Sequence, residues 1–173
     1  MLSFLQEEQQ PFIRYVHYFN NEVSTETVQE LIGILSAVPS VDLFISTPGG
    51  ELAAAQVLMH FINNHPDIKI YLTSYIASAG TFFLTDCSQE VYITEHLDWI
   101  MFHQGDREFG GRFRKEYLNT DILYEQTKQL NEEYANKFKR LGLTSKEIKD
   151  YMKGEDVILY KKDFHRLKIN RHG

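Results

Sequence analysis

Residues 68–84 hold the side chain most able to do chemistry. They read IKIYLTSYIASAGTFFL, an apolar β-rich run, then a turn of small residues at 77–80, then a second apolar run. A serine at such a strand-to-helix turn can hold its hydroxyl clear of the backbone, and the next N–H can point at the same reacting atom. Ser78 is therefore a candidate nucleophile.

A serine hydroxyl is a poor nucleophile near neutral pH and needs an adjacent base, usually a histidine. Of the seven histidines, only His103 stands at the end of an apolar strand pattern, WIMFH, downstream of Ser78 and just before a glycine-rich loop. α/β folds place functional groups at such strand ends. From its spacing alone, His103 is either a catalytic base or a satisfied surface histidine.

Two further features bear on such a site. The loop TPGG at residues 47–50 follows a predicted strand, and its glycines either bring a backbone N–H close to a ligand or form an ordinary strand–helix turn. It lacks the lysine and spacing of a phosphate loop, and no GxGxxG is present. A carboxylate to orient the histidine has several candidates, among which composition does not choose: Asp106, Asp121, Asp150, Glu155, Asp156 and Asp163.

The elements that must position these residues follow from hydrophobic periodicity. Strands are predicted at 12–19, 41–46, 68–73, 90–94, 98–102 and 157–160. Helices are predicted after an N-cap at Ser24, at 51–64, after the serine turn to about 85, at 112–141, and in a short segment ending at 152. Alternating strands and helices imply right-handed βαβ units. We expect one α/β domain over residues 1–173, with a short N-terminal lead at 1–11.

Composition excludes several classes of protein. The 173 residues are enough for a full core without a metal or disulfide, and we expect no metal and no cofactor. A net charge of -6 argues against nucleic acid as a partner, and Cys87, the single cysteine, has the pattern of a small core residue. No apolar run approaches the ~20 residues of a membrane span, and acids stand where a signal peptide is basic. The expected location is the cytoplasm.

Three motifs, in order and at near-family spacing, resemble those of the Clp protease proteolytic subunit (ClpP). They are STPGG, ASAG and MFHQ, where the family has sequences close to NSPGG, ASMG and MIHQP. The similarity covers roughly residues 12–170. It implies a ClpP/crotonase-like spiral of βαβ units with a projecting handle helix, the handle region lying at about 105–141. It also implies a serine endopeptidase of the ATP-dependent type that cleaves peptides or unfolded protein.

The resemblance assigns roles residue by residue. It implies Ser78 as nucleophile, His103 as base and Asp156 as the third member of the triad, with an acyl-enzyme forming on Ser78. The backbone N–H groups of Gly50 and Ala79 correspond to the oxyanion hole. Partners implied are copies of the chain itself, in a heptameric ring or double ring, and an AAA+ unfoldase.

Three departures from the family pattern carry expectations of their own. Gly105 replaces a proline, and the segment before Phe12 is shorter and lacks a clear axial-loop sequence, which weighs against the unfoldase and the fourteen-subunit assembly. Bulky Tyr75 and Ile76 precede Ala77, so we expect them to change the packing of the nucleophile strand and the shape of its pocket.

Two other hypotheses compete with the peptidase. A crotonase-like acyl-CoA enzyme would share the architecture and an oxyanion hole, but it would bind a CoA thioester and place a carboxylate at the reacting centre. A catalytically idle ClpP-like chain would serve as an assembly subunit.

Overall fold

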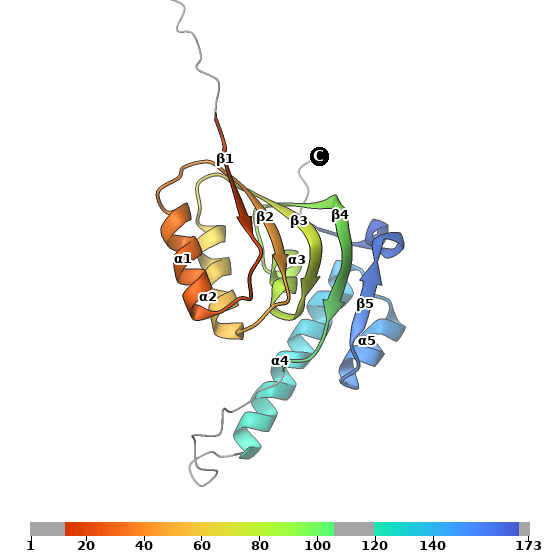
Figure 1. The fold of residues 1–173 in the computed structure, drawn as a ribbon. Coiled ribbons are helices and arrows are strands. Elements are labelled where there is room, and N and C mark those ends of the chain that lie inside the picture. Colours follow the sequence, from red (N-terminus) through yellow and green to blue (C-terminus); the bar gives the residue numbers. More distant parts are fainter. Residues whose placement is uncertain (1–12, 106–119, 170–173) are drawn as a thin grey trace, which may run out of the picture.

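Parallel strands form the centre of the molecule. The computed structural model describes residues 13–105 and 120–169, with side chains in the second range from residue 125 onward. One sheet has the order β1-β2-β3-β4-β5, parallel from β1 to β4 and antiparallel between β4 and β5 (Figure 1). The strands are β1 (Tyr15–Phe19), β2 (Val41–Thr47), β3 (Ile68–Ala77), β4 (Glu90–Phe102) and β5 (Val157–Tyr160).

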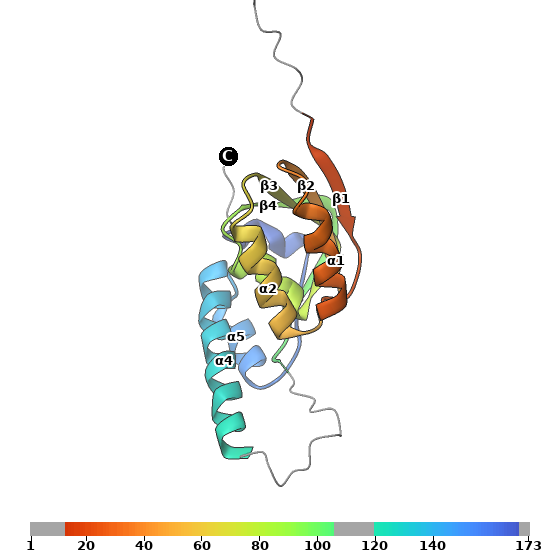
Figure 2. The same cartoon turned by 90° about the vertical axis from the view of Figure 1, so that its left-hand side faces the viewer.

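Helices in the parallel crossovers cover one face of this sheet. α1 (Thr25–Leu35) and α2 (Leu52–Asn63) lie side by side against it in both views (Figures 1 and 2). The predicted N-cap at Ser24 is confirmed, because its side chain accepts a hydrogen bond from the N–H of Thr27. The predicted βαβ pattern of the first half of the chain is therefore confirmed.

The core lies between the sheet and these helices. Alternate residues of the central strands face the helices, and apolar residues of the helices face the strands. These side chains are almost fully buried: Val41, Leu43 and Ile45 of β2, Ile70 and Leu72 of β3, Leu35 of α1, and Leu58 and Ile62 of α2. On the opposite face, Tyr18, Phe44, Tyr71 and Tyr92 stack across four strands with ring centroids 4.8–5.1 Å apart. The strand register is fixed from both faces as a result.

The long helix predicted in the second half is α4 (Thr120–Leu141), which extends beyond the sheet in both views (Figures 1 and 2). At 1.5 Å per residue its 22 residues span about 33 Å. Its C-terminal half packs against the body of the molecule through Tyr134 and Phe138, which contact Phe82 and Phe102. α5 (Ser145–Met152) follows, with a capping box at Thr144. No helix in the described ranges is long and apolar enough to cross a membrane.

One strand prediction was wrong. Residues 90–94 and 98–102 were predicted as separate strands, but β4 runs unbroken from Glu90 to Phe102. The β3–β4 register shifts on both sides of Ser74, with the extra residues in β4, and Leu97 pairs with Ser74 and is fully buried. The N-terminal lead and much of the predicted handle connection lie outside the described residues, so a single domain over the whole chain stays a prediction.

Candidate active site

Ser78 stands at the point where β3 ends and a short 3-10 helix (Ser78–Thr81) begins. Its φ is +53°, a left-handed conformation that costs a non-glycine residue about 1–2 kcal/mol. The hydroxyl of Thr81 donates to the Ser78 carbonyl at 2.7 Å and holds the turn closed. Strain of this kind persists only where the surroundings impose it, and it is common at functional sites.

The TPGG loop at residues 47–50 packs directly against the serine turn. A Cβ added to Gly49, whose φ is +91°, would lie 2.6 Å from the Ala77 carbonyl oxygen and 2.6 Å from Ser78 Cβ. Real Cβ atoms do not approach so closely, so only glycine allows the two segments to meet. The loop is therefore a close-approach loop rather than an ordinary strand–helix turn.

Backbone N–H groups from both segments lack partners. The bridge between Val23 and Gly50 uses the N–H groups of Val23 and Glu51, which leaves that of Gly50 unused in the described structure. Ala79 lies in the first turn of a helix, where N–H groups have no intrahelical acceptor. These two groups are the ones that the family resemblance assigns to an oxyanion hole.

His103 follows the last residue of β4 and reaches Ser78. Parallel pairing of Ala77 with Met101 brings the ends of β3 and β4 to the same edge of the sheet. There the distance between His103 Nε2 and Ser78 Oγ is 2.6 Å, a hydrogen bond. The imidazole is 33% exposed. The structure thus brings His103 into hydrogen-bond contact with Ser78, and its role as a catalytic base stays a prediction.

Asp156 reaches His103 through the register of β4 and β5. Phe102 pairs with Val157 in an antiparallel ladder, so the next opposed positions are His103 and Asp156. Asp156 Oδ1 lies 3.7 Å from His103 Nδ1, which is within ion-pair range but too long for a hydrogen bond. The carboxylate is 57% exposed.

The other carboxylates that were candidates to orient His103 either contact other residues or lie outside the part of the chain that the structure describes. Asp150 contacts Lys146 at 2.6 Å, Asp163 accepts the N–H of Tyr160 at 3.2 Å, and Glu155 lies 3.9 Å from Lys153. Asp106 and the side chain of Asp121 are outside the described part. In that part, Asp156 alone forms an ion-pair contact with His103.

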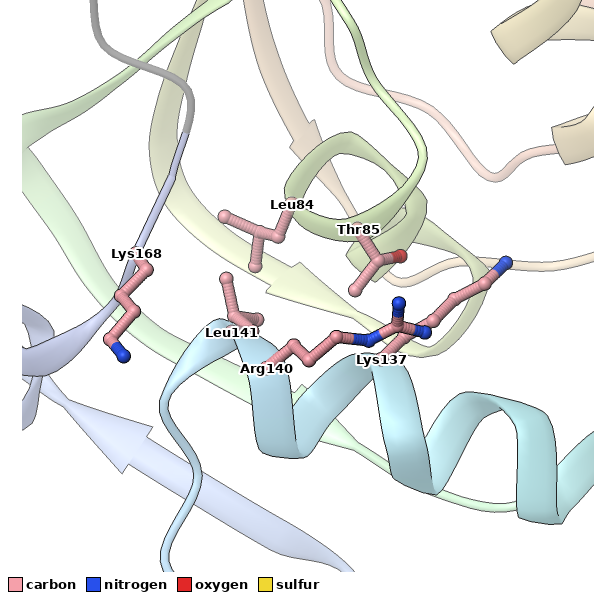
Figure 3. Close-up of a pocket in the computed structure, with 6 residues that line it drawn as sticks. All are labelled: Leu84, Thr85, Lys137, Arg140, Leu141 and Lys168. Carbon is pink, nitrogen blue, oxygen red and sulfur yellow. The ribbon is translucent and has the colours of Figure 1, made fainter.

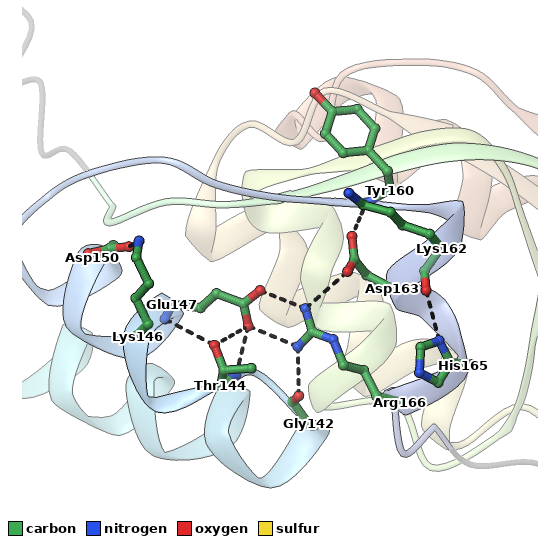
Figure 4. A network of polar contacts seen from close by, with 10 residues as sticks. All are labelled: Gly142, Thr144, Lys146, Glu147, Asp150, Tyr160, Lys162, Asp163, His165 and Arg166. Carbon is green, nitrogen blue, oxygen red and sulfur yellow. Dashed lines mark hydrogen bonds and ion pairs between the residues drawn. The ribbon is translucent and has the colours of Figure 1, made fainter.

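A polar network holds α5 and β5 in place behind the site. Arg166, at the end of the C-terminal 3-10 helix η3 (Lys161–Arg166), donates two hydrogen bonds to Glu147 of α5, at 2.6 and 2.8 Å (Figure 4). It also donates to the Gly142 carbonyl at 2.9 Å, next to the end of α4. On the other side, the Gln104 amide donates to the Tyr151 carbonyl at 2.9 Å. Asp156 is therefore positioned between two anchored segments.

The sequence also matches a family model. The Clp protease family model aligns with residues 3–159, most of the chain. The chain belongs to the Clp protease family.

A solved structure supports the same fold. A point mutant of ClpP1 from Listeria monocytogenes superimposes with a TM-score of 0.59 at 17% sequence identity, covering 86% of this chain and 84% of that one. No curated protein sequence matches the chain. The predicted α/β architecture of ClpP type is confirmed.

In this member of the Clp protease family, a cavity of about 580 Å³ opens in front of Ser78. Its walls come from the TPGG loop, the serine turn, His103 and one face of α4, and they include Glu22, Glu51, Leu52, Thr127, Leu130, Asn131, Tyr134 and Phe138. Tyr151 also lines it, and burial raises the pKa of that phenol to about 12, so the group stays neutral. Sequence reasoning did not find these lining residues, because they come together only when α4 packs on the sheet.

Tyr75 and Ile76 do not line this cavity, so any effect they have on its shape acts through the packing of β3. Tyr75 stacks on Trp99 with ring centroids 5.0 Å apart, and Ile76 is fully buried in the core. Another hollow of about 290 Å³, beside the C-terminal end of α4, is lined by Leu84, Thr85, Lys137, Arg140, Leu141 and Lys168 and holds no nucleophile–base pair (Figure 3). No group of three or more potential metal ligands occurs within the described ranges.

Proposed function

We propose that this protein is a serine endopeptidase that cleaves peptides or unfolded protein through an acyl-enzyme on Ser78. The observation that carries the proposal is the 2.6 Å contact between Ser78 Oγ and His103 Nε2 beside a cavity of about 580 Å³. The base accepts the hydroxyl proton as Oγ attacks the scissile carbonyl, and returns it to the leaving amine. Water then attacks the acyl-enzyme, with His103 again acting as base.

The remaining groups act through charge. Asp156 favours the tautomer with the proton on Nδ1 and stabilises the imidazolium that forms. The N–H groups of Gly50 and Ala79 receive the oxyanion, and removal of one such donor typically costs about 3–4 kcal/mol of transition-state stabilisation. Because Asp156 is 3.7 Å from His103 and largely exposed, its contact with the imidazole tightens when substrate fills the cavity.

A serine-directed fluorophosphonate tests the proposal. Wild-type protein is expected to be labelled and to hydrolyse a short fluorogenic peptide. The Ser78→Ala and His103→Ala variants are expected to lose both the labelling and the hydrolysis. Ser36→Ala, which removes the hydroxyl of the residue that follows α1 and does not line the cavity, keeps them. A folded wild-type protein that neither takes the label nor cleaves the peptide would point instead to the idle assembly subunit.

Assembly belongs to the same proposal. A helix that extends beyond the sheet, as α4 does, suits contacts with another copy of the chain. We expect a homo-oligomer, which a molecular-mass measurement by light scattering checks directly. Ring size, an AAA+ unfoldase partner and the cytoplasmic location stay predictions from the sequence.

A further inference from the structure

The cavity in front of Ser78 carries charge of one sign. Among its described lining residues, Glu22 and Glu51 are acidic, and there is no lysine or arginine. Both acids lie beside Gly50: a Cβ on that glycine would be 2.9 Å from Glu22 Cγ, and Glu51 is the next residue. Glu22 Cγ and the backbone of Glu51 therefore lie beside the residue whose N–H would receive an oxyanion, and both side chains line the cavity.

Neither acid is neutralised within the described part of the chain. Glu51 Oε2 accepts hydrogen bonds from the N–H and hydroxyl of Thr25, at 3.2 and 2.8 Å, which leave its negative charge in place. No lysine or arginine of the described ranges lies within ion-pair distance of Glu22 or Glu51. Two such charges oppose the growth of a third negative charge nearby, and a cation placed between them would offset this effect.

The rest of the cavity suits a long side chain with a polar end. Leu52, Leu130 and Phe138 give an apolar wall along which methylene groups can lie. Asn131 is only 8% exposed and lines the same cavity. An asparagine amide carries both acceptor and donor groups, so this wall of the cavity is polar as well as apolar.

We infer that this cavity selects peptides with lysine or arginine close to the scissile bond and disfavours peptides with acidic residues there. The expected difference in kcat/KM rests on the proposed peptidase function. The expected difference in peptide affinity needs only the cavity and the two acidic side chains that line it.

Matched peptides isolate the charge. Three-residue fluorogenic substrates carry lysine, norleucine or glutamate at each position in turn, with alanine elsewhere; norleucine keeps most of the aliphatic stem of lysine without the ammonium. At the position nearest Glu22 and Glu51 we expect kcat/KM to be roughly tenfold higher for lysine than for norleucine, and lower again for glutamate. Because the charges are exposed, the ratio should fall as NaCl rises from about 0.05 to 0.5 M.

Isosteric variants assign the effect. Glu22→Gln and Glu51→Gln keep the shape and the hydrogen-bond acceptor, and together they are expected to bring the lysine-to-norleucine ratio to within twofold of one. Glu26→Gln makes the same change of net charge on α1, outside the cavity, and should leave the ratio unchanged. A ratio near one in the wild type, or a high ratio that survives the double substitution, overturns the inference while the peptidase proposal stands.

Binding to Ser78→Ala separates the two proposals. On this variant the same peptides are compared by their Kd, measured by fluorescence polarisation, with no turnover required. If wild type neither reacts with the fluorophosphonate nor cleaves peptides, the peptidase proposal fails and the Kd ratio alone decides. Lysine peptides that bind no more tightly than norleucine peptides then refute the cation preference.

Discussion

The Arg166–Glu147 pair gives the sharpest stability prediction. Both side chains are 22% exposed, and two hydrogen bonds of 2.6 and 2.8 Å join them. Exposed pairs contribute about 0.2–1 kcal/mol, whereas removing one partner of a buried pair costs about 3–5 kcal/mol. We therefore expect Arg166→Met to lower the free energy of unfolding by about 2 kcal/mol, since the hydrogen bond to the Gly142 carbonyl is also lost.

The assay is urea unfolding at pH 7 of wild type, Arg166→Met, Glu147→Gln and the double variant. The four proteins close a double-mutant cycle, for which we expect a coupling energy of about 1 kcal/mol. Lys146→Met is the matched control: this lysine also pairs with a carboxylate of α5, at 2.6 Å, but its side chain is 84% exposed, so the loss should stay below about 0.5 kcal/mol. A coupling energy near zero, or an equal loss for Lys146→Met, would refute the reasoning.

The same pair predicts a pH dependence. Burial alone would raise the pKa of Glu147, but hydrogen bonds from Arg166 and Thr144 bring it below its ordinary value of 4.5. A carboxylate whose pKa is lower in the folded state stabilises the protein above its unfolded pKa, and this stability is lost as pH falls through the folded value. The gap between wild type and Arg166→Met should thus be constant from about pH 7 to 5 and narrow below that range. A gap that widens on acidification contradicts the assignment.

Two further predictions concern β3 and the single cysteine. Ser74 lies within β3 and has a φ of +56°, a conformation that glycine adopts without strain. In urea unfolding, Ser74→Gly should therefore raise the unfolding free energy by up to ~1 kcal/mol, and the β-branched Ser74→Val should lower it. Equal stability of the two variants would count against strain at this position. Burial raises the pKa of the Cys87 thiol to about 11, which leaves little reactive thiolate at pH 8. Iodoacetamide at pH 8 should therefore alkylate the native protein about a hundredfold more slowly than the urea-unfolded chain. Rates within tenfold of each other would show that the thiol is accessible.

Local sequence signals were sufficient for the first half of the fold. Ser24 as an N-cap, the apolar spacing of α2 and the short apolar run of β2 are properties of neighbouring residues, and each appears in the structure. The Ser78 turn was also visible, because a serine among small residues between two apolar runs is a local pattern. What local pattern did not reveal is the reason the turn holds, which is the approach of Gly49 from a segment about thirty residues earlier.

The carboxylate beside His103 could not be chosen from composition for a similar reason. Asp156 lies opposite His103 only because β5 runs antiparallel to β4, and a different register or direction would have presented Glu155 or Asp163. The family resemblance selected Asp156 where residue spacing did not. The unbroken β4 was missed because Glu95 and His96 interrupt its apolar pattern, while the pairing of Leu97 with β3 carries the strand through.

The candidate site thus has two layers that depend on different parts of the sequence. Backbone geometry sets the reacting centre: the close approach of Gly49, the left-handed Ser78 and the ends of β4 and β5 place the serine, histidine and carboxylate together. Exposed side chains at the rim, Glu22 and Glu51, set the charge of the cavity and contribute little to the core. Under the proposed function, we therefore expect substitution at the rim to change which peptides are accepted with little effect on the fold, and substitution of Gly49 to change both.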